Sequence, residues 1–207
     1  MPAAHSRAAP RRKERSARVT RTTRETDITV EIGVDGSGKA AVDTGVPFFN
    51  HMLESFARHG FFDLTVRARG DLEVDQHHTV EDVGLALGQA LREALGDKAG
   101  IGRFGEAACP LDEALVRVTV DLSGRPFFVY EVTIGQTRVG SFDTELVHDF
   151  LLALTNQLGM NLHVDMVRGR NPHHIIEATF KALARALDAA TQIDRRVEGV
   201  LSTKGTL

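Results

Sequence analysis

The sequence contains the pattern His-His-x-x-Glu twice, about a hundred residues apart, and these residue types are strong metal donors. The first motif consists of His77, His78 and Glu81, and the second motif consists of His173, His174 and Glu177. On a helix, where successive residues advance by about 100°, the glutamate lies between its two histidines. It can share a metal ion with either histidine, whereas the two imidazoles point too far apart to share one easily. Each motif is therefore half of two metal sites, and two motifs placed face to face would complete both.

Further donors flank the two motifs. His51 lies upstream of the first motif, and the corresponding place in the second half is Asp149, with His148 beside it, so either residue is a candidate for the matching ligand. Imidazole-rich sites with a carboxylate suit Zn, Mn, Fe, Co or Ni. A single His-His pair at a helix start is usually a cap or a solvated surface, but a second copy in register favours metal binding. His59 either lines the same cavity or ends its helix, and His163 is better explained as a packing histidine.

Basic residues near glycines suggest a site for a phosphate group. Arg103 lies in "GIGRFG" and Arg125 in "SGRPF", where a guanidinium and the backbone can both contact an anion. Ser202 and Lys204, in the tail "LSTKGTL", add a hydroxyl and an ammonium group. The glycines of "GIGRFG" do not indicate a dinucleotide site, because no strand runs directly into them and no helix follows.

The elements that must position these residues occur in two similar halves. In the first half, an alternating strand ends at "DGSGK", which predicts a hairpin to "AAVDTG". A helix over 47–60, a strand–turn–strand segment over 62–74 and a helix ending at Gly96 follow. The second half repeats this order, with the second motif opening its last helix, so we predict an internal duplication. The fold class is α+β, with the helices of both halves packed between two outer sheets.

Composition narrows the class of protein. The chain has 207 residues, a formal net charge of −3 and 42% hydrophobic residues, which is typical of a globular protein and gives no argument for nucleic acid or membrane as a partner. The single cysteine, Cys109, excludes an internal disulfide, fits a reducing cytosol and is interpreted as a buried apolar residue. Residues 1–18 are rich in arginine and are expected to form a disordered tail, which leaves one domain over 19–207 with repeats of about 19–108 and 109–207.

The chain resembles the imidazoleglycerol-phosphate dehydratases of histidine biosynthesis. The matching stretches run in family order from about Val19 to Leu207 and include "TGVPFFNHML", "DLEVDQHHTVEDVG", "GIGRFG", "PLDEAL", "DLSGRPF", "NPHHIIEATFKALARAL" and "STKG". The resemblance implies two four-stranded sheets around a four-helix bundle, with halves like domain 2 of ribosomal protein S5. It also implies a cytoplasmic 24-subunit shell with active sites between subunits, two manganese ions per active site, and a hydro-lyase that converts imidazoleglycerol phosphate into imidazoleacetol phosphate.

The resemblance also implies residue roles by position. The implied metal ligands are His51, His77, His78, Glu81, His173, His174 and Glu177, with Asp149 as the eighth at a place where relatives often have histidine or an acid. Arg103, Arg125, Ser202 and Lys204 would hold the phosphate, and Glu25 and His59 would face the substrate. Ser55 stands where some relatives have glutamine. Glu25 is the candidate for proton transfer at carbon, and Glu177 and His78 are further catalytic candidates; in an isolated sequence, Glu25 is equally an exposed acid at a strand start.

Two other functions remain open at this level. A zinc-type metallohydrolase would need one open metal position and a water molecule, but not two arginines and a Ser-x-Lys tail. A metal-storing shell would need neither Glu25 nor a phosphate site. Metal content together with an assay for ketone formation discriminates among the three.

Overall fold

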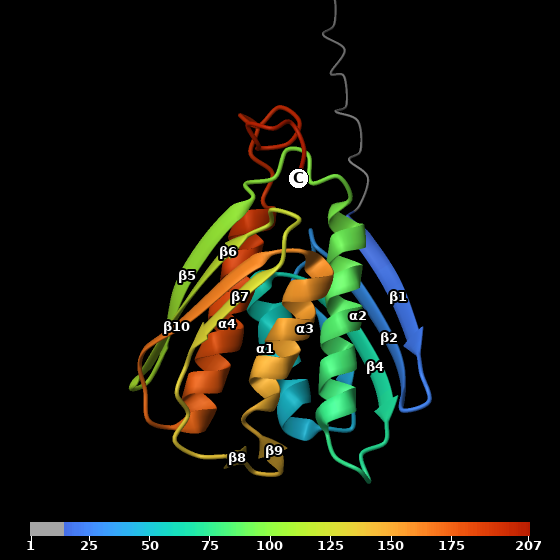
Figure 1. Cartoon of the computed structure of the whole chain (residues 1–207), viewed down its shortest axis with the longest axis vertical. Coiled ribbons are helices and arrows are strands. Elements are labelled where there is room, and N and C mark those ends of the chain that lie inside the picture. The colour runs from blue at the N-terminus through green and yellow to red at the C-terminus, as the bar shows by residue number, and fades with distance from the viewer. Residues whose placement is uncertain (1–14) are drawn as a thin grey trace, which may run out of the picture.

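Two four-stranded sheets enclose four helices in the computed structural model, which describes residues 15–207 (Figure 1). Most of the expected disordered tail, residues 1–14, lies outside the described residues. The first half contains β1 (Ser16–Thr22), β2 (Thr26–Gly33), β3 (Ala40–Asp43), α1 (Pro47–Gly60), β4 (Asp63–Gly70) and α2 (His77–Leu95). The second half contains β5 (Phe104–Leu111), β6 (Ala114–Asp121), β7 (Phe127–Glu131), β8 (Arg138–Val139), β9 (Phe142–Asp143), α3 (Leu146–Leu158), β10 (Asn161–Arg168) and α4 (Pro172–Thr191).

The strand order of the two sheets confirms the duplicated α+β architecture. One sheet has the order β1-β2-β4-β3 and the other has β5-β6-β10-β7, so each strand of the first half has a counterpart at the same place in the second. The last strand in each order, β3 or β7, is parallel to its neighbour, β4 or β10, and the other neighbouring strands are antiparallel. The observed order in each half is strand–strand–strand–helix–strand–helix, and the second half adds the small hairpin of β8 and β9.

The expected hairpin between β2 and β3 was wrong. The strand β3 pairs in parallel with β4, and β4 lies between β2 and β3. Asp63, at the start of β4, accepts hydrogen bonds from the backbone of Ser37 and Lys39 at 2.8 and 3.0 Å. A Cβ at Gly36 would lie 2.5 Å from the backbone nitrogen of Asp63. The "DGSGK" loop therefore packs on the start of β4 and does not form a tight hairpin turn between β2 and β3.

A second strand after β4 was also predicted wrongly. Gly70 ends β4, and a Cβ at this position would lie 2.1 Å from the hydroxyl oxygen of Thr79 on α2. The chain leaves the sheet here because the start of α2 packs directly on Gly70. Residues 71–76 instead form the turn that leads into the first motif.

Two edge strands were not predicted as strands. β1 begins at Ser16, inside the segment assigned to the tail, and pairs with β2 over its whole length. β5 contains Pro110, which is tolerated because the strand is at the sheet edge. The expected repeat boundary at residues 108–109 lies inside β5, so we propose that the repeats divide between α2 and β5.

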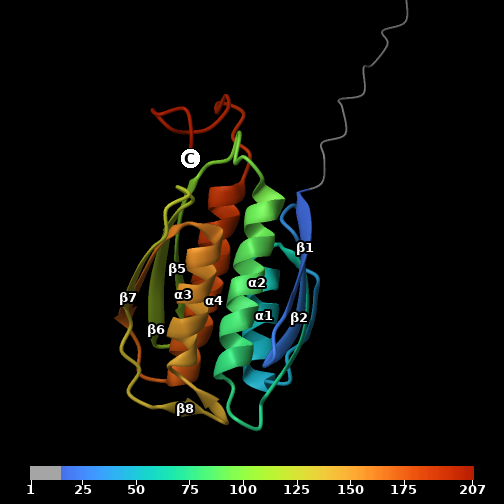
Figure 2. The same ribbon diagram turned by 45° about the vertical axis from the view of Figure 1, so that its right-hand side comes forward.

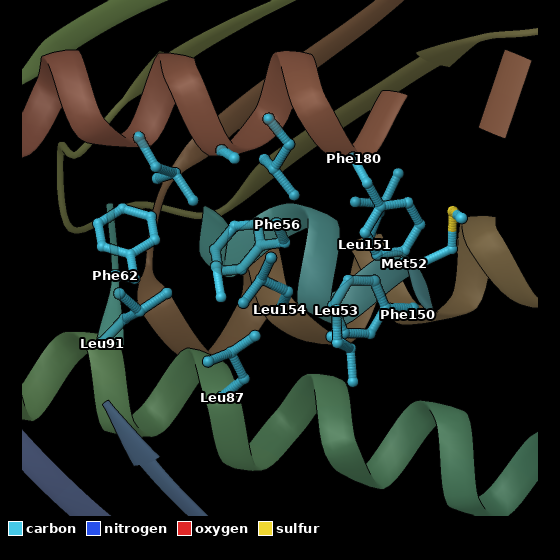
Figure 3. Close-up of a cluster of buried hydrophobic side chains, with 14 of the residues drawn as sticks. Met52, Leu53, Phe56, Phe62, Leu87, Leu91, Phe150, Leu151, Leu154 and Phe180 are labelled. Carbon is cyan, nitrogen blue, oxygen red and sulfur yellow. The ribbon is translucent and has the colours of Figure 1, made fainter. Parts of the chain in front are cut away.

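The helices of the two halves pack across each other and form the core. α2 contacts α3, and α1 contacts α4 (Figure 2). A Cβ at Gly84 or Gly88 would lie 2.7 Å from a backbone oxygen of α3, so these glycines permit the close approach of the two helices. Figure 3 shows Phe56, Leu87, Leu154 and other apolar side chains filling the space between α2 and α4. This core fixes the relative positions of the helix starts that carry the two motifs.

Cys109 is buried, as expected, and burial raises the pKa of its thiol. Among the described residues, the helices are too short or too polar to cross a membrane.

Candidate active site

The histidine pair of each motif lies in the first turn of a helix, and both helices begin at the same end of the bundle (Figure 1). Asp75 accepts a hydrogen bond from the backbone of His77 at 2.7 Å, and Asn171 caps α4 by accepting from the backbone of His173 at 3.0 Å. Pro172 occupies the first position of α4, where its missing N–H costs nothing. Turn and capping residues in the sequence thus place each histidine pair at a helix start.

One cluster of three donors has the spacing of a metal site. The Nε2 atoms of His51 and His173 lie 3.4 and 3.1 Å from Oε2 of Glu177, and the three donor atoms are within 4.8 Å of one another. An ion bound at about 2.0–2.2 Å from each ligand requires donor separations of this size. The other oxygen of Glu177 contacts Lys181 at 2.7 Å. Burial alone would raise the pKa of Glu177, but Lys181 and the two histidines outweigh it and the pKa is lowered.

A second group of donors lies at the related place on α2 and α3. Asp149 Oδ2 is 3.4 Å from Nδ1 of His77, and Glu81 Oε2 is 3.9 Å from Nε2 of the same ring. The two carboxylates face opposite nitrogens, so the three groups do not converge on one point as the first cluster does. Asp149, not His148, is directed at the first motif. His148 packs against Phe128 and Tyr130, with ring centroids 5.2 and 5.6 Å away.

The second histidine of each motif is paired with a carboxylate from outside the motif. Asp71 contacts Nδ1 of His78 at 3.0 Å, and Glu113 contacts Nδ1 of His174 at 2.8 Å. Hydrogen bonding to Asp71 raises the pKa of His78. The backbone N–H of Asn171 and then the His174 ring lower the pKa of Glu113 to about 2. Glu25 lies on the other side of His78, with Oε2 3.8 Å from Nε2.

The four residues expected at a phosphate site line one cavity of about 690 Å³. Arg103 adopts a φ of 67°, and Asp121 binds its guanidinium through both oxygens at 2.6 and 3.0 Å. Its Nη1 donates to the carbonyl of Leu201 at 2.7 Å, which ties the C-terminal tail over the cavity. Arg125, Ser202 and Lys204 complete the predicted set.

The cavity and the motifs lie at opposite ends of the helix bundle. The backbone N–H of Arg103 donates to the carbonyl of Ala190, near the end of α4, whereas His173 is near its start. At 1.5 Å per residue, these ends are about 25 Å apart. Figure 1 shows the tail at the end away from the starts of α2 and α4. Nor does any hydrogen bond or ion pair within residues 15–207 join the two motifs, so the face-to-face completion expected from the sequence does not occur inside one chain.

The remaining predicted residues have distinct surroundings. His59 is close to Lys181 and Arg185 of α4, and burial together with these cations lowers its pKa. His163 is exposed on the outer face of β10, with its ring 6.4 Å from that of the exposed Phe127, so it is not the buried packing histidine that the sequence predicted. The Ser55 hydroxyl is buried and has no hydrogen-bond partner among the described residues.

Several site residues were missed in the sequence. Asp71, Glu113 and Lys181 contact motif residues, and Arg196 lines the phosphate-type cavity. Of these residues, only Lys181 could have been predicted from the sequence, because it follows Glu177 by one helical turn. Glu113 lies 61 residues before His174, and Asp71 lies seven residues before His78 in the turn outside α2, so no helical spacing rule finds either carboxylate.

These features define a class: a duplicated α+β enzyme with a metal-type histidine–glutamate cluster at one end and an arginine-lined cavity at the other. The family model for imidazoleglycerol-phosphate dehydratase matches residues 44–187. The chain is 56% identical to the imidazoleglycerol-phosphate dehydratase of Geobacter metallireducens over 93% of its length and 99% of the relative, and 61% identical to that of a Geobacillus species over the same shares. The chain therefore belongs to the imidazoleglycerol-phosphate dehydratase family, and it is a hydro-lyase.

Solved structures agree with this assignment. The crystal structure of imidazoleglycerol-phosphate dehydratase from Staphylococcus aureus has a TM-score of 0.79 at 39% identity and matches 86% of this chain and 99% of its own. The enzyme from Pyrococcus furiosus, crystallised in complex with (S)-C348, has a TM-score of 0.80 at 41% identity, with 91% and 100% of the two chains covered.

Proposed function

We propose that the chain performs the reaction of its family, the dehydration of imidazoleglycerol phosphate to imidazoleacetol phosphate in histidine biosynthesis, with two manganese ions per active site. The observation that carries the metal part of the proposal is the convergence of His51, His173 and Glu177 on one point. Two imidazoles and one carboxylate suit a first-row transition-metal ion, and the choice of manganese follows from the family. Manganese, when bound, supplies Lewis acidity and a template for the imidazole ring of the substrate.

The chain's own residues account for binding and proton transfer. The C2 proton of the substrate is not acidic, because no carbonyl lies beside it, so a positioned base is required. Glu25 is our candidate, since its carboxylate lies 3.8 Å from Nε2 of His78 and is therefore next to the motif that would receive the imidazole ring. The C2 proton goes to this base, and the C3 hydroxyl takes up one proton and leaves as water, so the net loss is the C2 proton and the C3 hydroxyl. The resulting enol then becomes the ketone by taking a proton at C3 and losing the proton of its hydroxyl group.

Metal binding is assigned to residues of both motifs and their flanks. Glu177 and His78, the other catalytic candidates, would contribute by holding the metal ion to which the imidazole ring of the substrate binds. The proposed metal ligands are His51, His77, His78, Glu81, Asp149, His173, His174 and Glu177. Because His51 comes from the first repeat and Glu177 from the second, neither repeat forms the first cluster alone. This supports a single catalytic domain made of two repeats.

The phosphate would be bound by Arg103, Arg125, Ser202 and Lys204, with His59 facing the substrate. The cavity and the first cluster of one chain are about 25 Å apart along α4. The three-carbon chain of the substrate spans only about 5 Å. We therefore propose that each active site combines ends of different subunits in a 24-subunit shell. We place the enzyme in the cytoplasm, where its single cysteine stays reduced.

Product analysis tests this function against the two alternatives. Purified protein incubated with imidazoleglycerol phosphate and manganese is expected to form imidazoleacetol phosphate, detected as a ketone. Release of inorganic phosphate without ketone would indicate a hydrolase, and the absence of any turnover in metal-loaded protein would indicate storage. Either result would refute the proposal.

A further inference from the structure

We infer that Asp71 and Glu113 are positioning residues that fix the tautomer and ring orientation of His78 and His174, keeping Nε2 of each histidine available as a metal donor. This inference rests on the proposed metal centre and adds the two carboxylates to its residue roles. A carboxylate only accepts hydrogen bonds, so a ring nitrogen in contact with it must carry the proton. Both contacts are made to Nδ1, at 3.0 and 2.8 Å, which leaves the lone pair on Nε2.

The two carboxylates come from different places in the duplicated fold. Asp71 directly follows β4, whereas Glu113 directly precedes β6. The counterpart of Asp71 after β10 is Gly169, which has no side chain to offer. The same histidine geometry is thus reached in the two halves by non-equivalent residues. If this contact were only a remnant of the duplication, equivalent residues would make it. Because non-equivalent residues make it, the feature that the two halves share is a carboxylate at Nδ1 of the second histidine.

The duplication also relates Glu113 to Glu25. Each residue immediately precedes the second strand of its sheet, Glu113 before β6 and Glu25 before β2. Glu113 is used to hold His174, but in the first half Asp71 takes that role. Glu25 is therefore left on the Nε2 side of His78, 3.8 Å away, where a substrate could meet it. The presence of Asp71 explains how one of two duplicated glutamates became free for proton transfer.

The two carboxylates differ in their freedom to rotate. Glu113 Oε2 contacts His174, while Oε1 accepts the backbone N–H groups of Asn171 and Arg170 at 2.7 and 3.1 Å. Both oxygens are therefore required as acceptors. The Asp71 carboxylate has only His78 as a partner among residues 15–207, at 3.0 and 3.2 Å from its two oxygens, and its side chain is 20% exposed.

This difference gives opposite expectations for two isosteric amide variants. In Asp71→Asn, the amide can rotate so that its oxygen faces Nδ1 and its NH₂ faces water. In Glu113→Gln, one orientation places the NH₂ against Nδ1, which moves the ring proton to Nε2 and blocks metal binding. The other orientation places the NH₂ against two backbone N–H groups. Glu113→Gln must therefore lose an interaction, whereas Asp71→Asn need not.

The test measures Mn²⁺ affinity of the full chain by competition with a chelator, with bound metal counted by elemental analysis. We expect about 10–100-fold weaker binding in Glu113→Gln and in Asp71→Ala, since loss of such outer partners has effects of this size. Asp71→Asn should bind nearly as well as the parent chain. Glu106→Gln removes the same charge from an exposed position on β5 and should leave the affinity unchanged.

If Glu113→Gln does not fold, the pair Asp71→Ala and Asp71→Asn decides alone. Parent-like affinity in Asp71→Ala, or equal losses in Asp71→Ala and Asp71→Asn, would overturn the inference, because an acceptor at Nδ1 would then not be what matters. The parent chain separates this failure from that of the proposed function. A parent chain that binds no metal contradicts the proposed function, whereas a metal-binding parent with unaffected variants contradicts the inference only.

Discussion

Mixing two inactive variants would test whether metal and phosphate ends of different subunits form one active site. Glu177→Gln removes the carboxylate at the centre of the first cluster, and Arg125→Ala removes a cation from the cavity at the other end. The two positions are separated by nearly the whole of α4, which has 20 residues and is therefore about 30 Å long. No single substrate molecule reaches both ends of one chain, so each variant leaves the opposite end intact.

The expected recovery follows from counting subunits. If one subunit provides the metal end and another the phosphate end, random co-assembly of equal amounts leaves about one quarter of the sites with two intact ends. The assay is ketone formation after the two variants are dissociated, mixed and reassembled with manganese. Because reassembly is random, activity should approach about one quarter of the parent level.

The control is a mixture of two variants at the same end. Glu177→Gln and His173→Ala both damage the first cluster, which is built within one chain, so their mixture should stay inactive. Recovery in this control, or no recovery in the Glu177→Gln and Arg125→Ala mixture despite reassembly, would refute the shared site.

Three further predictions concern single residues. Glu25→Gln should lower kcat strongly with little change in KM, and an unchanged kcat would remove Glu25 from proton transfer. Asp149→Ala should reduce bound manganese per chain while Asp149→His retains it, and full metal content in Asp149→Ala would contradict its role as a ligand. Gly88→Ala should lower the melting temperature, because its Cβ would lie 2.7 Å from the backbone of Leu154. Overpacking of this kind costs about 1–3 kcal/mol, which is more than the ~1 kcal/mol gained in helix propensity. A higher melting temperature would show that α2 and α3 can move apart.

Acid stability provides a fourth prediction. The folded-state pKa of Glu113 is about 2, below its usual value of 4.5. A group whose pKa is lowered on folding stabilises the protein fully above its unfolded pKa, and this contribution is lost as the pH falls toward the folded pKa. Acid unfolding should therefore be less steep in Glu113→Gln between about pH 4.5 and 2. An identical acid transition in the two proteins would contradict the assigned contacts of Glu113.

The sequence predicted the helices and the duplication because their signals are local and periodic. Apolar spacing marked α1 and α2, and the repeated motif marked the equivalence of the halves. Strand pairing was harder to predict, because β3 pairs with β4 only after α1 has crossed over, a contact that no local pattern records. The edge strands β1 and β5 escaped notice because edge positions tolerate arginine and proline, which lower strand propensity.

The same limit applies to the site. The motifs, His51 and the phosphate-type residues carry recognisable chemistry at readable positions. Asp71 and Glu113 are ordinary acids in turns, and only the folded chain brings them to Nδ1 of the histidines. Likewise, the sequence places the second motif at the start of the last helix and the tail after its end, but only the folded chain brings Arg103 and Arg125 to the end of the bundle where the tail lies.

Dependence of turnover on bound metal tests the central claim most directly. One preparation of the parent protein would be freed of metal with a chelator and then titrated with manganese. Ketone formation and metal content would be measured at each step. We predict no dehydration in metal-free protein and a rise in activity that ends at two ions per active site. Turnover at the full rate in a thoroughly metal-free preparation would contradict the account.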